Sequence, residues 1–137
     1  MEDWADESLY WHAVYERWMV DEQWEPFSKE VFGVMPSLLQ PIIKPIARRQ
    51  VRGQLRAEGL GRLSIDEERQ KFVAILGWLE SNLDGDYFCG SDLSVADLAI
   101  AAPLAGLALP GTPFSSDEIR KRRRLESWLD RVKSACA

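Results

Sequence analysis

Cysteine and histidine are both scarce in this sequence, which holds two cysteines and one histidine in 137 residues. Cys89 and Cys136 form no Cys-x-x-Cys pair and show no metal-ligand spacing, so the sequence predicts no metal site. Two reduced thiols are typical of a cytosolic protein, and we therefore expect a cytoplasmic location. The sequence alone leaves open a disulfide between the two cysteines.

Long hydrophobic runs and excess positive charge are also lacking. The longest apolar stretch, residues 95–109, contains Asp97 and Pro103 and is too short for a bilayer, so we expect no membrane span. The N-terminus has no basic segment followed by an apolar one, which argues against a secretory signal. Lys and Arg number 17 against 22 Asp and Glu, a net charge of −5, and we expect no nucleic-acid partner.

The apolar–polar alternation of β-strands is absent, and helical spacing dominates the whole chain. A first helix is predicted over residues 3–20. At about 100° per residue, Trp4, Trp11, Tyr15 and Trp18 fall within an arc of roughly 60° on that helix. Core packing is the expected role of this aromatic face, and the alternative is that part of it lines a ligand pocket.

The next part of the chain is punctuated by proline and glycine. Residues 21–35, with Pro26 and Gly33, predict a loop with at most a short helical turn. A second helical region follows over residues 36–58. Two internal prolines should kink or interrupt it, so its regular part is predicted over residues 46–58.

Two pairs of polar residues predict the starts of two further helices. In each pair, Ser64 with Glu67 and Ser94 with Asp97, the hydroxyl can accept the amide of the third helical residue while the carboxylate reaches back. This structural capping accounts for all four residues without a catalytic role. The helix after Ser94, about residues 95–109, is apolar nearly all round, which is typical of a helix in the centre of a bundle.

A last helix is predicted over residues 117–134, after a break at residues 110–113 that is rich in proline and glycine. Ser115 or Ser116 could cap it. The count is five or six helices and no strand. The sequence therefore predicts an all-α fold, with residues 1–137 forming a single helical bundle.

Three stretches carry a resemblance to a known family. Residues 88–99 resemble the segment that starts the buried central helix of glutathione S-transferase C-terminal domains. Residues 55–64, followed by Glu67, are similar to the helix–Gly–x–Gly–Arg–x–Ser junction of metaxin-like and failed-axon-connections-like proteins, a divergent branch of that superfamily. Leu63 departs from the branch, whose members often carry histidine there.

The opening segment, with Trp4, Trp11 and Trp18, also looks like the first C-terminal-domain helix of this branch. The resemblance implies the orthogonal helical bundle of the glutathione S-transferase C-terminal domain, with a buried central helix starting near Ser94. In this family a thioredoxin-like domain precedes these helices, binds glutathione and supplies the activating residue. No part of the present sequence resembles that domain, so the chain is expected to be either a free-standing helical domain or a fragment.

The resemblance therefore implies no catalytic residue and no cofactor in this chain. The implied function is the helical half of a glutathione S-transferase-like protein, which contributes a hydrophobic pocket and an association or dimer surface. The alternative is a non-catalytic protein–protein association module of the metaxin-like type. In the superfamily the first helix of this domain lines the site of the hydrophobic co-substrate, which makes Tyr10, Trp11, Tyr15 and Trp18 the pocket candidates.

Two further features invite a chemical interpretation. His12, with Glu16 four residues on, could form a His–carboxylate pair, but we expect a surface or edge position without function. Two basic runs are predicted to be solvated helix faces, with an anion site or an acidic partner as the alternative. The first run is Lys44, Arg48, Arg49, Arg52 and Arg56, and the second is Arg120, Lys121, Arg122, Arg123 and Arg124.

Overall fold

The computed structural model describes the backbone of residues 2–137 and the side chains of residues 7–137. Within this range the chain is helical and has no strand, which confirms the predicted all-α class. The side chain of Trp4, predicted on the aromatic face, lies outside the described residues. In chain order the elements are α1 (Glu2–Met19), α2 (Asp21–Phe32), α3 (Gln40–Ala57), the 3₁₀ helix η1 (Leu60–Arg62), α4 (Ile65–Asn82), α5 (Val95–Leu107), α6 (Pro113–Arg120) and α7 (Arg123–Cys136).

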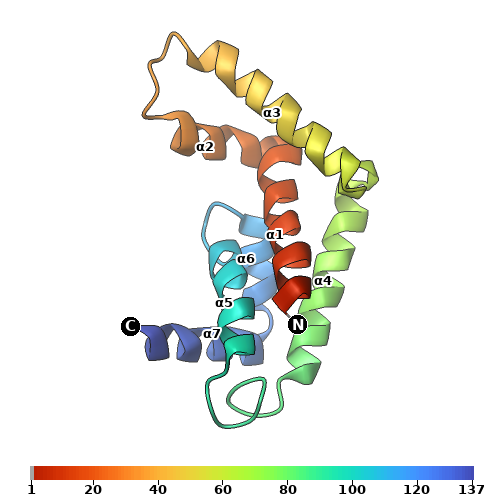
Figure 1. Ribbon diagram of the computed structural model, residues 1–137, viewed down its shortest axis with the longest axis vertical. Coiled ribbons are helices and arrows are strands. Elements are labelled where there is room, and N and C mark those ends of the chain that lie inside the picture. The colour runs from red at the N-terminus through yellow and green to blue at the C-terminus, as the bar shows by residue number, and fades with distance from the viewer. Residues whose placement is uncertain (1) are drawn as a thin grey trace.

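Helix α1 runs through the middle of the molecule, between α4 and α5 (Figure 1). Helices α6 and α7 close the bundle, and α2 and α3 form an arm that projects from it (Figure 1). Each fully buried Leu or Phe side chain stabilises such a bundle by about 1.5–3 kcal/mol. The core side chains come from five helices and are Leu9, Phe72, Leu76, Leu79, Ile100, Leu104, Leu107, Ile119, Leu125 and Trp128.

Both predicted capping boxes are present. At the start of α4, the amide of Glu67 donates to Ser64 Oγ at 3.2 Å, and the amide of Ser64 donates back to Glu67 Oε2 at 2.8 Å. The start of α5 repeats this geometry with Ser94 and Asp97. Each box satisfies amides that a helix N-terminus otherwise leaves unpaired, so these two boundaries follow from local sequence.

The Asp97 carboxylate does more than cap α5, because it accepts four hydrogen bonds. Oδ1 accepts the amide of Phe88 at 2.9 Å and the indole Nε1–H of Trp128 at 2.8 Å. Oδ2 accepts the amide of Ser94 at 2.9 Å and the Ser94 hydroxyl. Burial alone would raise the pKa of Asp97, but these four donors together lower it. The ionised carboxylate thus joins the loop before α5, α5 itself and α7.

Helix α5 buries one face and exposes the other. Ile100, Leu104 and Leu107 are fully buried against the core, as predicted for the helix that starts near Ser94. Val95 and Leu98 lie on the opposite face and are 66% and 42% exposed. No helix in the described part of the chain combines the length and apolarity needed to cross a bilayer.

The predicted loop over residues 21–35 is wrong, because most of it forms α2. Pro26 lies inside this helix and would normally weaken it by removing one backbone donor. Aromatic packing offsets that cost: Trp24 and Phe27 contact Trp18 of α1 at ring-centroid distances of 5.2 and 5.4 Å. Tertiary contact therefore outweighs the local proline signal.

Two other helix boundaries also differ from the prediction. Helix α3 begins at Gln40 rather than near residue 46, because Pro41 occupies its first turn, where proline is tolerated, and Pro45 remains inside it. The predicted helix 117–134 is two helices, α6 and α7. The break between them allows both Ile119 and Leu125 to enter the core. The described residues thus contain seven α-helices instead of five or six.

We expect Asp97→Asn to lower the free energy of unfolding at pH 7 by about 3 kcal/mol, because an amide NH₂ cannot accept the donors that converge on one carboxylate oxygen. The lowered pKa of Asp97 adds a pH signature. The stability that the ionised Asp97 carboxylate contributes is complete above the unfolded-state pKa of about 3.9, and it is lost as the pH falls through the folded-state pKa. The difference between the two proteins in urea denaturation should therefore shrink below about pH 4.

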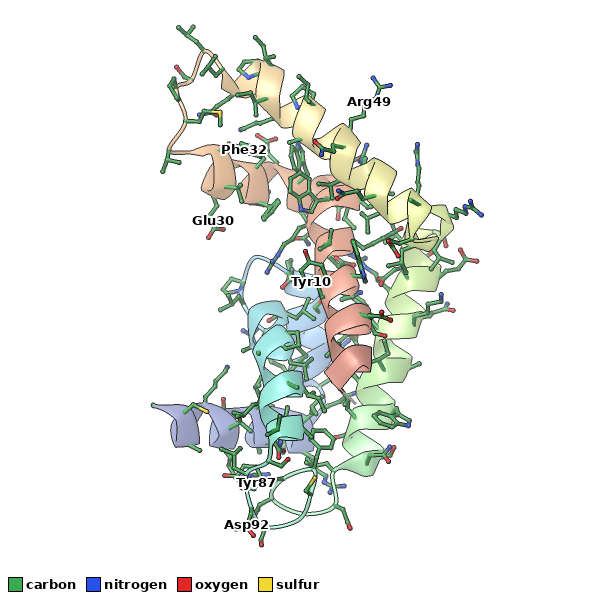
Figure 2. The ribbon with its side chains drawn as sticks, viewed as in Figure 1. Tyr10, Glu30, Phe32, Arg49, Tyr87 and Asp92 are labelled. Atoms are coloured by element: carbon green, nitrogen blue, oxygen red, sulfur yellow. The ribbon has the colours of Figure 1, made fainter. Side chains whose placement is uncertain are left out.

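Asp92→Asn provides the matched control, because Asp92 is an exposed aspartate of the same loop (Figure 2). This change should alter stability by less than about 0.5 kcal/mol. Equal effects of the two substitutions, or a difference that does not depend on pH, would contradict the role assigned to Asp97.

Candidate functional site

A chain of buried polar side chains links α1, α4 and α6. His12 Nδ1 lies 2.6 Å from Glu68 Oε2, and His12 Nε2 lies 2.9 Å from Ser115 Oγ. The imidazole is stacked on Phe72, with ring centroids 3.9 Å apart. For neutral histidine this network assigns the proton to Nδ1, which donates to Glu68, while the Ser115 hydroxyl donates to Nε2.

A second polar pair, Glu16 with Arg69, lies one helical turn further along α1. Glu16 is fully buried and accepts two hydrogen bonds from the Arg69 guanidinium, at 2.9 and 3.2 Å. This bond raises the pKa of Arg69. The Tyr15 hydroxyl donates to the carbonyl of Leu63 at 3.0 Å, and burial raises its pKa, with further contributions from the Glu68 and Glu16 carboxylates. These bonds satisfy the polar groups that α1 carries into the core.

The order serine–histidine–carboxylate matches that of a nucleophilic triad. A triad also needs an accessible hydroxyl, and Ser115 is 0% exposed here, with His12 at 1%. His12, Glu16 and Glu68 also bring potential metal-ligand atoms within 4.8 Å of one another. Both His12 nitrogens and both Glu16 oxygens already have partners, so a cation would have to displace Arg69. The geometry therefore favours a stabilising polar network.

The expected surface or edge position of His12 is wrong. Its partners are 56 and 103 positions away in the chain and could not be identified by spacing. One sequence signal was available: Glu68 occupies the same helical stripe as Phe72, Leu76 and Leu79, so a carboxylate stands where an apolar residue is expected. A charged residue on an apolar stripe indicates a buried group that requires a partner.

Among the hollows formed by the described residues, none is lined by all four aromatic pocket candidates. Tyr10 is exposed, and Tyr15 is buried in the polar network. Trp11 lines a small hollow of about 190 Å³ beside Glu68 and Lys71. Trp18 instead packs against α2 through Trp24 and Phe27. Their assignment as pocket residues remains a prediction.

The largest of the described grooves lies between α2 and the connection from α5 to α6, with a volume of about 620 Å³. Phe27 forms part of its wall, and the Trp18 ring contacts the Phe27 ring with a distance of 5.4 Å between the ring centroids. Arg17 places its guanidinium 5.9 Å from the Phe27 ring centroid. The remaining lining is mostly apolar, with Pro26, Val31, Leu109 and Pro110. This size and polarity suit a small apolar ligand.

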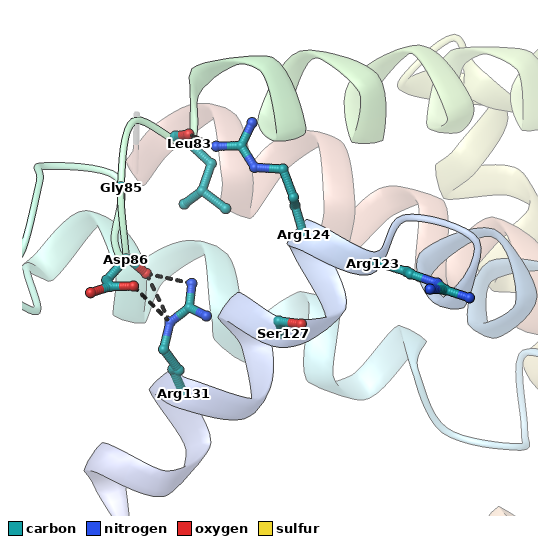
Figure 3. A pocket seen from close by; sticks show the side chains of 7 residues that line it. All are labelled: Leu83, Gly85, Asp86, Arg123, Arg124, Ser127 and Arg131. Atoms are coloured by element: carbon teal, nitrogen blue, oxygen red, sulfur yellow. Dashed lines mark hydrogen bonds and ion pairs between the residues drawn. The ribbon is translucent and has the colours of Figure 1, made fainter.

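A second hollow, of about 350 Å³, lies between the loop after α4 and the start of α7 (Figure 3). Arginines of α7 line it, but two of them are held by backbone carbonyls. Arg124 donates to the carbonyl of Leu83, and Arg131 donates to that of Asp86 at 2.9 and 3.2 Å. These bonds tie the loop to α7.

Three residues of the basic run at residues 120–124 form ion pairs with acidic side chains of α6. Arg120 pairs with Asp117, while Lys121 and Arg122 pair with Glu118. The alternative of an anion site in this run stays a prediction.

Comparison with known families gives one match. A family model described as glutathione S-transferase, C-terminal domain, matches residues 62–131, about half of the chain. This region runs from the end of η1 through α4, α5 and α6 into α7, and it includes both capping boxes. No curated protein and no solved structure matches the chain.

We expect His12→Ala to lower the free energy of unfolding by about 3 kcal/mol, because the buried Glu68 carboxylate loses its partner. Ser115→Ala removes one neutral hydrogen bond and should cost about 1 kcal/mol. Urea denaturation at pH 7 measures both values. Ser127→Ala is the matched control, because Ser127 is an exposed serine, and it should change stability by less than about 0.5 kcal/mol.

A loss below about 1 kcal/mol for His12→Ala would contradict the stabilising role of the network. Labelling of Ser115 by a fluorophosphonate probe in the folded protein would contradict it as well, because that reaction needs an accessible hydroxyl.

Proposed function

The chain belongs to the glutathione S-transferase C-terminal domain family, and we propose that it serves as the helical half of a glutathione S-transferase-like protein. In this proposal it contributes an apolar groove and an association surface but is not catalytic alone. Glutathione and the activating residue would belong to a thioredoxin-like domain, as the family resemblance implies.

The exposed apolar stripe on α5 is the observation that carries this proposal. Val95, Leu98 and Ala102 are all exposed and share one face of the helix at about 100° per residue, and Leu109 extends that face just past the helix end. Their side chains carry no charge, and they lie opposite the buried face of α5. An uncharged stripe of this kind on an otherwise packed helix supports contact with another protein domain.

The groove between α2 and the α5–α6 connection supports the second part of the proposal. Its volume of about 620 Å³ lies within the range of about 300–1,000 Å³ that small-molecule sites occupy. Phe27 and Val31 provide apolar contacts, and Arg17 and Glu30 provide polar groups at the same site. A hydrophobic co-substrate is the class of ligand that this lining favours.

The second candidate function is a non-catalytic association module of the metaxin-like type. The exposed α5 stripe supports this function as well, because an uncharged apolar surface can receive a protein partner that is not a catalytic domain. The two functions differ in one respect that is simple to test. Only the first requires the parent gene to encode a thioredoxin-like domain upstream of these helices.

We expect the double substitution Val95→Ser with Leu98→Ser to leave the thermal unfolding temperature of the chain nearly unchanged, because both side chains are already exposed. The same pair should weaken binding of the separately produced upstream thioredoxin-like domain at least tenfold, measured by isothermal titration calorimetry. Ile65→Ser is the matched control, since Ile65 is an exposed apolar residue of α4. Unaltered binding by the double variant, or a gene without such a domain, would refute the proposal.

The isolated chain should not conjugate glutathione to chlorodinitrobenzene above the rate without protein. The reason is that the proposed division of labour places the glutathione site and the activating residue in the other domain. A spectrophotometric assay with the purified chain measures this rate. Conjugation above background that persists after rechromatography would show that the chain is catalytic alone.

A further inference from the structure

The arm formed by α2 and α3 ends in a tip of exposed apolar side chains. Val34 is 96% exposed and Leu38 87%, while Ile42 and Ile46 on the first turns of α3 are 60% and 62% exposed. This tip lies at the far end of the arm from the core (Figure 1). Such a cluster of large apolar side chains is unusual for a surface in contact with water alone.

The charge of the same segment is strongly one-sided. Residues 31–43 contain no charged residue, and residues 44–57 contain five basic residues and no acidic one. The chain as a whole has a net charge of −5, so this basic segment opposes the overall balance. An uncharged apolar tip followed by a purely basic helix is the pattern of segments that lie in the interface of an anionic bilayer.

The basic residues of α3 divide into two sets by the direction they face. Arg48 and Arg52 face inward: Arg48 donates to the carbonyl of Trp18 at 2.9 Å and to Asp21 at 2.6 Å, and Arg52 donates to the same two residues. Arg48 also lies 4.8 Å from the ring centroid of Trp24. These contacts hold the base of the arm against the C-terminal end of α1, where cations are favoured.

Arg49 and Arg56 belong to the outward set. Both are exposed and form no ion pair with a described residue. Arg49 points away from α2, and Glu30 of α2 points to the opposite side of the arm (Figure 2). At about 100° per residue, Arg49 and Arg56 share the face of α3 that carries Ile42. One outer face thus combines apolar side chains at the tip with unpaired positive charge behind it.

We propose that this arm binds the surface of an anionic lipid bilayer, with the apolar tip inserted among the acyl chains and the outer arginines at the headgroups. A second copy of the chain is a poorer occupant, because two such arms would bring like charges together. Nucleic acid is poorer too, because four exposed aliphatic side chains gain nothing from a phosphate backbone. An anionic bilayer suits both features, because its acyl chains accommodate the apolar tip and its headgroups attract the arginines.

The test is cosedimentation of the full chain with vesicles of phosphatidylcholine alone or with about one third phosphatidylserine. The chain should bind the anionic vesicles at least tenfold more tightly, and binding should weaken as salt is raised. Arg49→Ala with Arg56→Ala should lose about 30-fold in affinity for anionic vesicles, from about fivefold per arginine near the membrane surface. Arg123→Ala, an exposed arginine remote from the arm, should have no effect.

The tip is tested by Leu38→Ser with Ile42→Ser, which should reduce binding at least tenfold at every salt concentration. Val95→Ser with Leu98→Ser removes two exposed apolar residues from α5 and should leave vesicle binding unchanged. All four side chains are exposed, so the variants should keep the wild-type unfolding temperature, which circular dichroism verifies.

A fluorescent reporter locates the inserted residues directly. In a background with Cys89→Ser and Cys136→Ser, an environment-sensitive dye on Leu38→Cys should shift its emission to the blue with anionic vesicles. The same dye on Leu98→Cys should not. Absence of binding to anionic vesicles, binding indifferent to the tip variants, or a dimer that the tip variants convert to monomer would each overturn the proposal.

Discussion

The carboxylate of Asp97 is the constraint on which the bundle most depends. Each of its oxygens accepts two donors, and those donors come from Phe88 in the preceding loop, from Ser94 at the start of α5 and from Trp128 in α7. The loop, α5 and α7 can therefore occupy only one mutual arrangement in which all four donors are satisfied. An apolar core alone would specify that arrangement less sharply, because hydrophobic contact has no direction.

The network around His12 performs a similar task at another junction of the core. It links α1 to α4 through Glu68 and to α6 through Ser115, while the Glu16–Arg69 pair adds a second bridge between α1 and α4. Each partner makes burial of the others tolerable, because an unpaired polar group in the core would be costly. The Ser115–His12–Glu68 arrangement has the residue types of a catalytic triad. Because it is buried, its role is to stabilise the fold.

The surface left uncovered by this framework falls into two parts of different chemistry. The α5 stripe has no exposed charged residue on its own helix, because Asp97 is buried, whereas the tip of the α2–α3 arm adjoins a helix with five basic and no acidic residues. The two parts lie on different portions of the molecule (Figure 1). A protein domain suits the α5 stripe and an anionic bilayer suits the tip of the arm. The two proposals therefore depend on different residues.

The sequence by itself determined the features that depend on neighbours within one helical turn. The all-α class, the extent of α1 and the two capping boxes at Ser64 and Ser94 follow from local spacing, and the structure confirms them. Only the tertiary structure decided the rest. Helix α2 persists through Pro26 because Trp24 and Phe27 pack on Trp18, and His12 is buried because Glu68 and Ser115 approach it from distant positions. Local patterns report which residues are apolar or can cap a helix, but the partner of a buried polar group depends on how distant helices meet.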